Sequence, residues 1–185
     1  LAAPAQRIED LAVLVLAAEA AGVTRWALDT AVEYAKVREQ FGKPIGSFQA
    51  IKHMCAEMLL RAEQVSVAAA DVAQAATADD DAQLSVAAAV AAVAAIDAAT
   101  ANTRDCIQVL GGIGITWEHD AHLYLRRAYG IAQLLGGRSR WLRRVVELTG
   151  AGVRRSLDVD LSSVEHLRPE IAAELAEVAK LPVAQ

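Results

Sequence analysis

Apolar residues recur every three or four positions along much of the chain, as they do on one face of an α-helix. The pattern predicts three long helices and two short ones, over residues 6–40, 48–76, 82–110, 118–134 and 139–148. Long helices joined by short loops pack as an antiparallel bundle. We therefore expect an all-α fold, an antiparallel four-helix bundle.

Residues that end or begin helices lie between these stretches. Gly42 and Pro44 are a stop signal for the first helix, and Ser47 is a candidate N-cap for the second. The three aspartates at residues 79–81 mark the next turn and supply negative charge at a helix N-terminus. Gly22 lies inside the first helix, which suggests close packing against a neighbouring helix.

The pattern changes character after residue 150. Residues 1–150 account for the whole predicted bundle and form its domain. Residues 151–185 begin with a glycine-containing linker and continue with one amphipathic helix, from about Pro169 to Lys180. We expect this second part to be a linker followed by a single helix.

Composition favours the same fold and excludes some functions. The chain has 185 residues, 55% hydrophobic and only 4% aromatic, and most of the apolar residues are alanine, the best helix former. The formal net charge of −5 gives no electrostatic footprint for nucleic acid. An apolar run over residues 85–101 is too short for a membrane span and is interrupted by Asp97, so a buried bundle helix is the better interpretation.

Two cysteines, Cys55 and Cys106, each lie in an apolar helical pattern, where buried free thiols are expected. Two thiols make no disulfide framework, and a reducing cytoplasm fits them best. No charged segment followed by an apolar one opens the chain, so no signal peptide is expected.

The segment from Arg38 to Gln49 is the first candidate for chemistry. Arg38 stands at the exit of one predicted helix, and backbone amides near Ser47 and Phe48 open the next. An arginine beside the free amides of a helix N-terminus can bind a pyrophosphate. The alternative is structural, with Arg38 capping its helix while Phe41 and Phe48 pack in the core.

The second candidate is the glycine-rich segment that follows Gln108. Glycines allow a ligand to approach the backbone closely. A run of glycines at a helix end is also what a left-handed helix cap looks like. Because the segment follows a helix and not a strand, it does not fit a Rossmann dinucleotide site.

Together the two segments resemble the acyl-CoA dehydrogenase family. The pattern Arg-x-x-Phe-Gly-x-x-Ile-x-x-Phe-Gln begins at Arg38, and Gln-x-Leu-Gly-Gly-x-Gly begins at Gln108. The resemblance is to the C-terminal helical domain of that family and spans about residues 8–148, including Tyr34-Ala35-x-Val37-Arg38 and His122-x-Tyr124-x-Arg126.

The resemblance implies an FAD site. Arg38 would bind the FAD pyrophosphate with Phe41 beside the cofactor, while Phe48 and Gln49 would contact the adenosine portion. A further set would reach the FAD of a neighbouring subunit: Gln108, Val109, Leu110, Gly111 and Gly112. Oligomerisation through the bundle, as a homo- or hetero-oligomer, is then part of the site.

The resemblance also implies where a catalytic base should lie. In the family a glutamate usually takes the α-proton of an acyl-CoA while hydride leaves the β-carbon for the flavin. Leu135 occupies that position before Gly136, and Ala12 occupies the position that some relatives use on the first helix. Neither side chain accepts a proton, so no catalytic residue is assigned. The carboxylates within two helical turns are Glu9, Asp10 and Glu19.

Residues 117–127 resemble a branch that acts on steroid side chains, whose members are heteromeric or fused and carry one degenerate half. The tail from Arg168 resembles the opening helix of a second dehydrogenase unit. His119 and His122 could share one helix face, but no third ligand is identifiable, so no metal is expected.

We therefore expect an FAD-binding and oligomerisation domain that is inactive alone. The family implies an acyl-CoA substrate and an electron-transfer flavoprotein as partner, and neither nucleic acid nor membrane is expected. The alternative is a non-catalytic helical module that assembles with an active dehydrogenase subunit.

Overall fold

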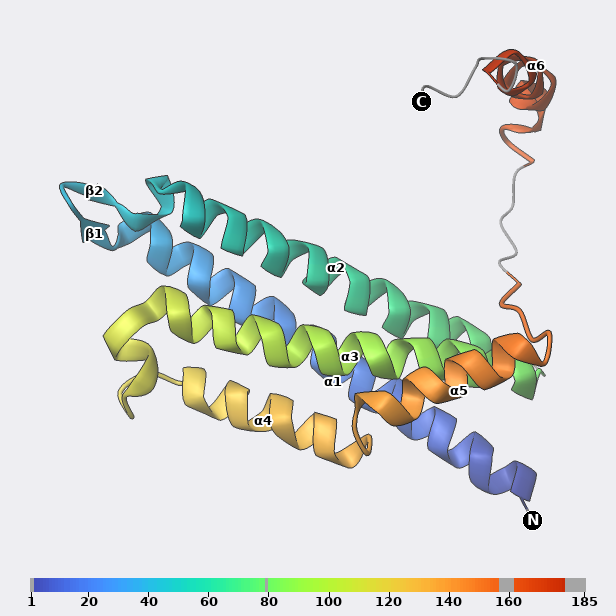
Figure 1. Ribbon diagram of the computed structural model, residues 1–185, viewed down its shortest axis with the longest axis horizontal. Coiled ribbons are helices and arrows are strands. Elements are labelled where there is room, and N and C mark those ends of the chain that lie inside the picture. The colour runs from blue at the N-terminus through green and yellow to red at the C-terminus, as the bar shows by residue number, and fades with distance from the viewer. Residues whose placement is uncertain (1, 79, 157–161, 179–185) are drawn as a thin grey trace. The chain divides into compact units, whose positions relative to one another are not determined.

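The computed structural model of the protein describes residues 2–78, 80–156 and 162–178, and these residues form α-helices joined by short turns (Figure 1). The helices are α1 (Ala2–Val37), α2 (Gln49–Thr77), α3 (Asp81–Leu110), α4 (Ala121–Leu134), α5 (Arg138–Gly150) and α6 (Arg168–Val178). The prediction of an all-α bundle is confirmed.

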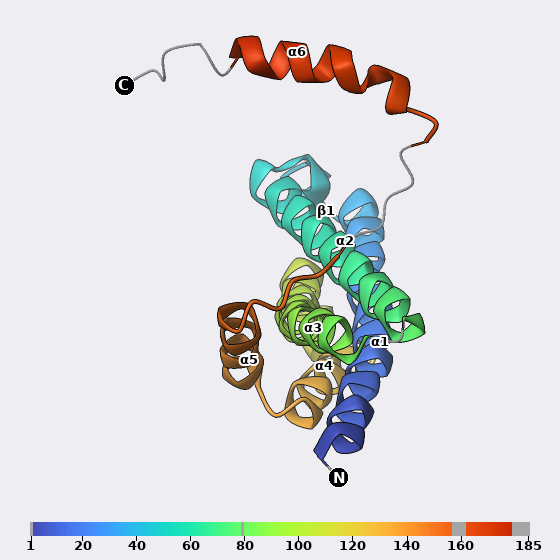
Figure 2. The same cartoon turned by 90° about the vertical axis from the view of Figure 1, so that its right-hand side faces the viewer.

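Helix α3 lies at the centre of the bundle. Helices α1, α2 and α3 run side by side in alternating directions, and α4 and α5 both pack along α3 (Figures 1 and 2). Most of the buried residues of α3 are alanine or valine, whose small side chains let four other helices pack closely around it. By length and composition alone, Ala5–Val37 and Asp81–Ile115 could each cross a membrane. In this fold the apolar face of α3 is covered by its neighbours.

The core has two parts, one toward each end of the bundle. The part near the start of α1 includes the fully buried Leu84 and Trp141, and the part near the end of α1 includes Met58 and Leu110. A buried amide connects the three long helices at the second part: the side-chain nitrogen of Asn102 on α3 donates to the Met58 carbonyl oxygen at 2.8 Å and reaches the Thr24 carbonyl oxygen at 3.4 Å. The buried amide nitrogen is thus paired, as apolar surroundings require, while the Asn102 Oδ1 atom accepts no hydrogen bond from a described residue.

Asp80 caps the N-terminus of α3 with its side chain. The Asp80 carboxylate accepts hydrogen bonds from the backbone N–H groups of Ala82 at 3.0 Å and Gln83 at 3.1 Å. The backbone hydrogen bond from Gln83 is the main reason that the pKa of Asp80 is lowered. Asp79, also expected in this turn, lies outside the described residues.

Three local predictions are wrong. Ser47 does not cap α2: it lies in a 3₁₀ turn (Ile45–Ser47), and Phe48 takes the N-cap position without a side-chain hydrogen bond. Helix α4 begins at Ala121, three residues after the predicted start at Glu118, because residues 116–120 form turns. Gly22 is exposed, and a Cβ added there would meet nothing within 4 Å, so it allows no close helix contact.

The chain divides into two compact units, Leu1–Arg155 and Ser156–Gln185. In the second unit, a 3₁₀ turn (Glu165–Leu167) precedes α6, and Arg168 donates two hydrogen bonds to the Glu165 carboxylate. The helix predicted from Pro169 is therefore present, although its predicted end at Lys180 lies outside the described residues.

Candidate functional site

A two-residue hairpin connects α1 to the turn before α2. Its strands, β1 (Glu39–Gln40) and β2 (Lys43–Pro44), are antiparallel, and the loop residues Phe41 and Gly42 have φ angles of 56° and 76°. Positive φ at both loop positions is the signature of a type I′ turn, which glycine adopts freely and phenylalanine does not. Phe41 is also 91% exposed. The hairpin thus holds the Phe41 backbone in a strained conformation, with the aromatic ring facing solvent at one end of the bundle.

Arg38 stands where α1 meets this hairpin. Its backbone is fixed on both sides, because its N–H donates to the Tyr34 carbonyl oxygen at 2.9 Å and its own carbonyl oxygen accepts from Ile45 at 2.7 Å. Its side chain is exposed and makes no hydrogen bond or ion pair with any described residue. The guanidinium caps no helix carbonyl, and all five of its N–H donors are available.

The glycine loop, residues 111–114, follows the end of α3 at the same end of the bundle as Arg38. Gly111 takes φ 63° and ψ −136°, and its N–H donates to the carbonyl oxygens of Gln108 and Ile107. A 3₁₀ turn (Gly111–Ile115) follows, and Gly114 lies so close to α3 that an added Cβ would be 2.8 Å from the Ile107 carbonyl oxygen. Left-handed backbone and close approach thus both require glycine in this loop.

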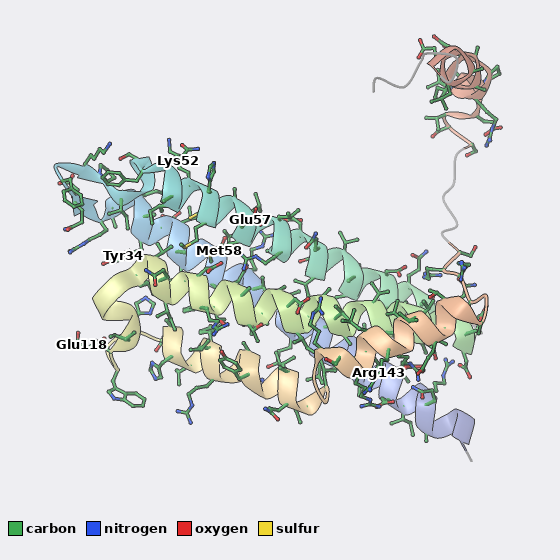
Figure 3. The ribbon with its side chains drawn as sticks, in the orientation of Figure 1. Tyr34, Lys52, Glu57, Met58, Glu118 and Arg143 are labelled. Atoms are coloured by element: carbon green, nitrogen blue, oxygen red, sulfur yellow. The ribbon has the colours of Figure 1, made fainter. Side chains whose placement is uncertain are left out.

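Arg38 and the glycine loop line one open cleft of about 490 Å³. Figure 3 labels Tyr34, another lining residue, between the ends of α1 and α3. The lining residues are Tyr34, Arg38, Gln40, Ile45, Val109, Leu110, Gly111, Gly112 and Ile113. Arg38 is the single charged residue among them. The cleft is therefore a mostly neutral surface with one cation, which suits an anionic group on a larger ligand.

The other predicted cofactor residues lie around this cleft and do not line it. Phe41 and Phe48 meet edge to face with ring centroids 6.1 Å apart, and the ammonium of Lys43 lies 4.4 Å from the centroid of Phe48. Gln49 has its Nε2 atom 2.9 Å from His53 Nε2, on the first turns of α2. These residues belong to the hairpin side of the same end.

The segment before the glycine loop presents different groups to solvent and to the core. Gln108 is exposed on the last turn of α3 and does not line the cleft. The side chains of Val109 and Leu110 are buried in the core. Val109 and Leu110 therefore line the cleft with only 4% and 2% of their surface exposed.

The expected base positions hold no proton acceptor in the structure either. Leu135 ends α4 with its side chain 3% exposed, and its carbonyl oxygen accepts from the indole N–H of Trp141 at 2.7 Å. Gly136 and Gly137 follow with φ of 73° and 86°. Ala12 is exposed on α1. The α4–α5 turn is thus fixed from inside by the buried Trp141.

The three neighbouring carboxylates are all in ion pairs. Glu9 pairs with Arg140, and Glu19 pairs with Arg127, which donates a second hydrogen bond at 2.6 Å. The hydrogen bond from Arg127 is the main cause that lowers the pKa of Glu19. A carboxylate whose proton affinity is lowered in this way is a weaker base.

Asp10 belongs to a buried polar network that the sequence did not predict. Asp10 is 1% exposed, accepts from the Ser85 hydroxyl at 2.6 Å, and lies 3.5 Å from Arg144. Gln6 donates to Asp10 at 3.0 Å and accepts from Arg144 at 2.8 Å. The network joins α1, α3 and α5. The one available signal was a carboxylate next to the apolar face of a helix.

The two histidines considered for a metal do not share a helix face. His119 precedes α4 and accepts a hydrogen bond from the Ala121 backbone at 3.1 Å, while His122 lies on the helix with its Nδ1 atom 2.8 Å from the His119 carbonyl oxygen. Within the described parts of the chain, no three His, Cys, Asp or Glu side chains come together as a metal site.

Comparison with known proteins decides the family. The family model for the acyl-CoA dehydrogenase C-terminal domain matches residues 11–148. The chain belongs to the acyl-CoA dehydrogenase family. Enzymes of this family are FAD-dependent oxidoreductases. The matched region begins within α1, ends two residues before the end of α5, and excludes α6.

Individual relatives agree with this family. Acyl-CoA dehydrogenase FadE34 of Mycobacterium tuberculosis is 73% identical over 177 residues, which cover 96% of this chain and 25% of FadE34. The chain thus spans about a quarter of the length of that relative. A variant of the steroid acyl-CoA dehydrogenase Tcur3481–Tcur3483 is 33% identical with a TM-score of 0.73, over 77% of this chain and 39% of that chain.

The ChsE4–ChsE5 complex of Mycobacterium tuberculosis is 30% identical with a TM-score of 0.68, over 77% of this chain and 38% of that chain. Two findings thus agree on the fold of this acyl-CoA dehydrogenase domain: the family model and the solved structures. The roles of individual residues are inferred from the cleft that Arg38 and the glycine loop line.

Proposed function

We propose that the chain is the FAD-binding and oligomerisation domain of an acyl-CoA dehydrogenase, in a half that lacks its own catalytic base. The observation that carries the proposal is the shared cleft of Arg38 and the glycine loop. Two segments about sixty residues apart in the sequence, each with a motif of the family, meet at one surface.

The residues in the cleft fit the pyrophosphate of FAD. A guanidinium with no protein partner can give two parallel hydrogen bonds to phosphate oxygens, and Arg38 is such a group. Cβ atoms added at Gly111 and Gly112 would meet nothing within 4 Å, so the space beside their backbone is open to a ligand. Phe41 offers an exposed aromatic ring next to this space.

The cleft is open on its outer side, so other walls must cover a dinucleotide bound there. In this proposal a neighbouring subunit or half supplies them, which makes oligomerisation part of FAD binding. Support comes from relatives, because ChsE4–ChsE5 is described as a complex of two different proteins. A homo- or hetero-oligomer through the helical bundle follows for this chain.

The reaction assigned to the whole protein is α,β-dehydrogenation of an acyl-CoA thioester. Bound FAD supplies the hydride acceptor. In this chain Arg38 and the glycine loop hold and orient the cofactor, while Leu135 and Ala12 provide nothing that could take the α-proton. Proton removal is therefore assigned to another half, and residues 1–185 alone are expected to be inactive.

Likeness to a steroid acyl-CoA dehydrogenase favours a steroid side chain as the acyl group. By family analogy, an electron-transfer flavoprotein would reoxidise the flavin, and a cytoplasmic location fits the two free thiols.

The tail is proposed to begin a second dehydrogenase unit. Helix α6 exposes Ile171 and Leu175, an apolar pair one turn apart that a folded neighbour would normally cover. The chain matches about a quarter of FadE34, which leaves room for further units in a protein of that length.

The experiment is purification of the full-length protein with its flavin content measured by visible absorbance. We expect bound flavin that is released on denaturation. A colourless protein that still assembles with an active dehydrogenase subunit would instead support the alternative, a non-catalytic helical module. That alternative draws on one observation, the complete pairing of carboxylates around the base positions.

A further inference from the structure

Arg140 lies directly against the position where the family's base is expected. It belongs to the first turn of α5 and its side chain passes over Gly136, the residue after Leu135. A Cβ added at Gly136 would be 3.4 Å from Arg140 Nη1 and 3.6 Å from its Cδ. The guanidinium carbon also lies 5.0 Å from the ring centroid of Trp141, at cation–π distance.

The partner of Arg140 is Glu9, on α1. One Glu9 carboxylate oxygen accepts from Arg140, and the other accepts from the Gln6 amide at 3.2 Å. Glu9 lies one helical turn before Ala12, the second position where a base is expected. The ion pair thus connects α1, which carries Ala12, to α5, which follows the turn after Leu135.

This pair differs from the buried one beside it. The Glu9 and Arg140 side chains keep 31% and 47% of their surface exposed, whereas Asp10 is 1% exposed and pairs with Arg144. Asp10 is buried, and the Arg144 side chain that reaches it is 22% exposed. Glu9 and Arg140 are at the surface of the bundle, where a bound acyl group could reach them.

We propose that Glu9 and Arg140 close the base site of this half as an internally neutral ion pair, so that Glu9 is not a working base. The inference rests on the proposed function, since it takes the α4–α5 turn to face the acyl-CoA. Both Glu9 oxygens accept hydrogen bonds, one from Arg140 and one from Gln6, and these bonds hold the carboxylate against its own protein. Arg140 is the positioning residue that keeps the carboxylate occupied.

The first test asks whether the positive charge of Arg140 matters or only its apolar methylene groups. Arg140→Lys keeps the charge and the methylenes, whereas Arg140→Met keeps only an apolar side chain. The two variants are compared in the full chain by thermal unfolding. We expect Arg140→Met to lower the Tm by roughly 1–3 °C and Arg140→Lys to restore most of it. Most of the loss should disappear in a Glu9→Gln background, where only the contact of Arg140 with the Trp141 ring remains to be lost. Equal Tm values for Arg140→Met and Arg140→Lys would contradict a stabilising ion pair between Glu9 and Arg140.

The second test asks whether Glu9 removes protons. The full-length protein is incubated with acyl-CoA in deuterated water, and exchange of the α-hydrogen is followed, a step that needs a base and no flavin reduction. Loss of a working base costs ~10²–10⁴-fold in rate. We expect Glu9→Gln to exchange as fast as the unmodified protein and as the surface control Glu57→Gln.

An exchange rate that falls about a hundredfold in Glu9→Gln alone would make Glu9 the base and overturn the inference. The proposed function fails by a different result, a full-length protein without flavin. The flavin content is measured on the same samples, so the two failures are distinguishable.

Discussion

The two ends of the bundle treat their charged groups in opposite ways. At the hairpin end, Arg38 has no partner among the described residues and Phe41 is almost fully exposed. At the other end, where α5 packs on α1 and α3, Asp10 and Arg144 are paired and buried or half-buried. Figure 3 labels Tyr34 at the first end and Arg143 on α5 toward the second.

The difference separates an end whose charged groups are paired within the protein from an end whose arginine has no partner among the described residues. A buried charge without a partner is costly, and Asp10 is satisfied by Gln6, Ser85 and Arg144, of which Arg144 comes from α5. An exposed arginine costs almost nothing to leave unpaired and keeps its donors for a phosphate. In the proposed function, the paired charges that stabilise the fold and the arginine that binds FAD therefore lie at opposite ends of one small bundle.

The largest effect should come from breaking the buried network. Arg144→Met leaves Asp10 buried without its cation, and we expect a loss of about 3–5 kcal/mol in the free energy of unfolding. Urea denaturation of the full chain measures it. The matched control is Arg38→Met, the same chemical change at the other end, which should stay within about 0.5 kcal/mol. Similar losses for both variants would remove the distinction between the two ends.

The hairpin end should be sensitive to backbone conformation even though the Arg38 side chain has no partner among the described residues. Gly111→Ala forces an alanine into φ 63°, ψ −136°, and we expect it to cost about 1–3 kcal/mol. Gly112→Ala is the control, because Gly112 has no positive φ and open space around it. That variant should change the unfolding free energy by less than about 0.5 kcal/mol. Equal tolerance of both alanines would contradict the strained cap.

The smallest effect is the pH dependence of the surface pair on α1 and α4. Arg127 lowers the pKa of Glu19, so its contribution to stability is present above the unfolded pKa and is lost as the pH falls through the lower folded pKa. Because the pair is exposed, the contribution of Glu19 is below about 1 kcal/mol. Glu19→Gln should flatten the acid side of the stability curve below the ordinary glutamate pKa of 4.5.

Salt provides the check on that assignment. High ionic strength screens exposed pairs, so the unmodified protein should approach the Glu19→Gln variant in concentrated salt. If the unmodified protein and Glu19→Gln lose stability equally as the pH falls at low salt, other carboxylates cause that loss.

Most of the fold could be predicted from the sequence because its signals are local. Helical periodicity, alanine content and the Gly42–Pro44 and Asp80 boundary residues all act within a few positions of the element that they define. The start of α4 was missed because Glu118 and Asp120 resemble a helix N-terminus, while the chain turns until Ala121. The hairpin was missed because its strands have only two residues each.

The site could be predicted in part, for a different reason. Arg38 and the glycine loop were found through a family motif, and local reasoning alone left each of them ambiguous. The Asp10 network could not be found, since Arg144 lies far away in the sequence and tertiary packing alone brings it to Asp10. The same holds for Glu9 and Arg140.

The most direct test of the account is the affinity of the full-length protein for FAD with Arg38 replaced. Arg38→Met removes charge-assisted hydrogen bonds to the pyrophosphate, and we predict roughly 10–100-fold weaker FAD binding by titration calorimetry of the flavin-free protein. Arg143→Met, at an exposed arginine near the other end, is the matched control and should bind FAD like the unmodified protein. Unchanged FAD affinity in Arg38→Met would contradict the assignment of the cleft.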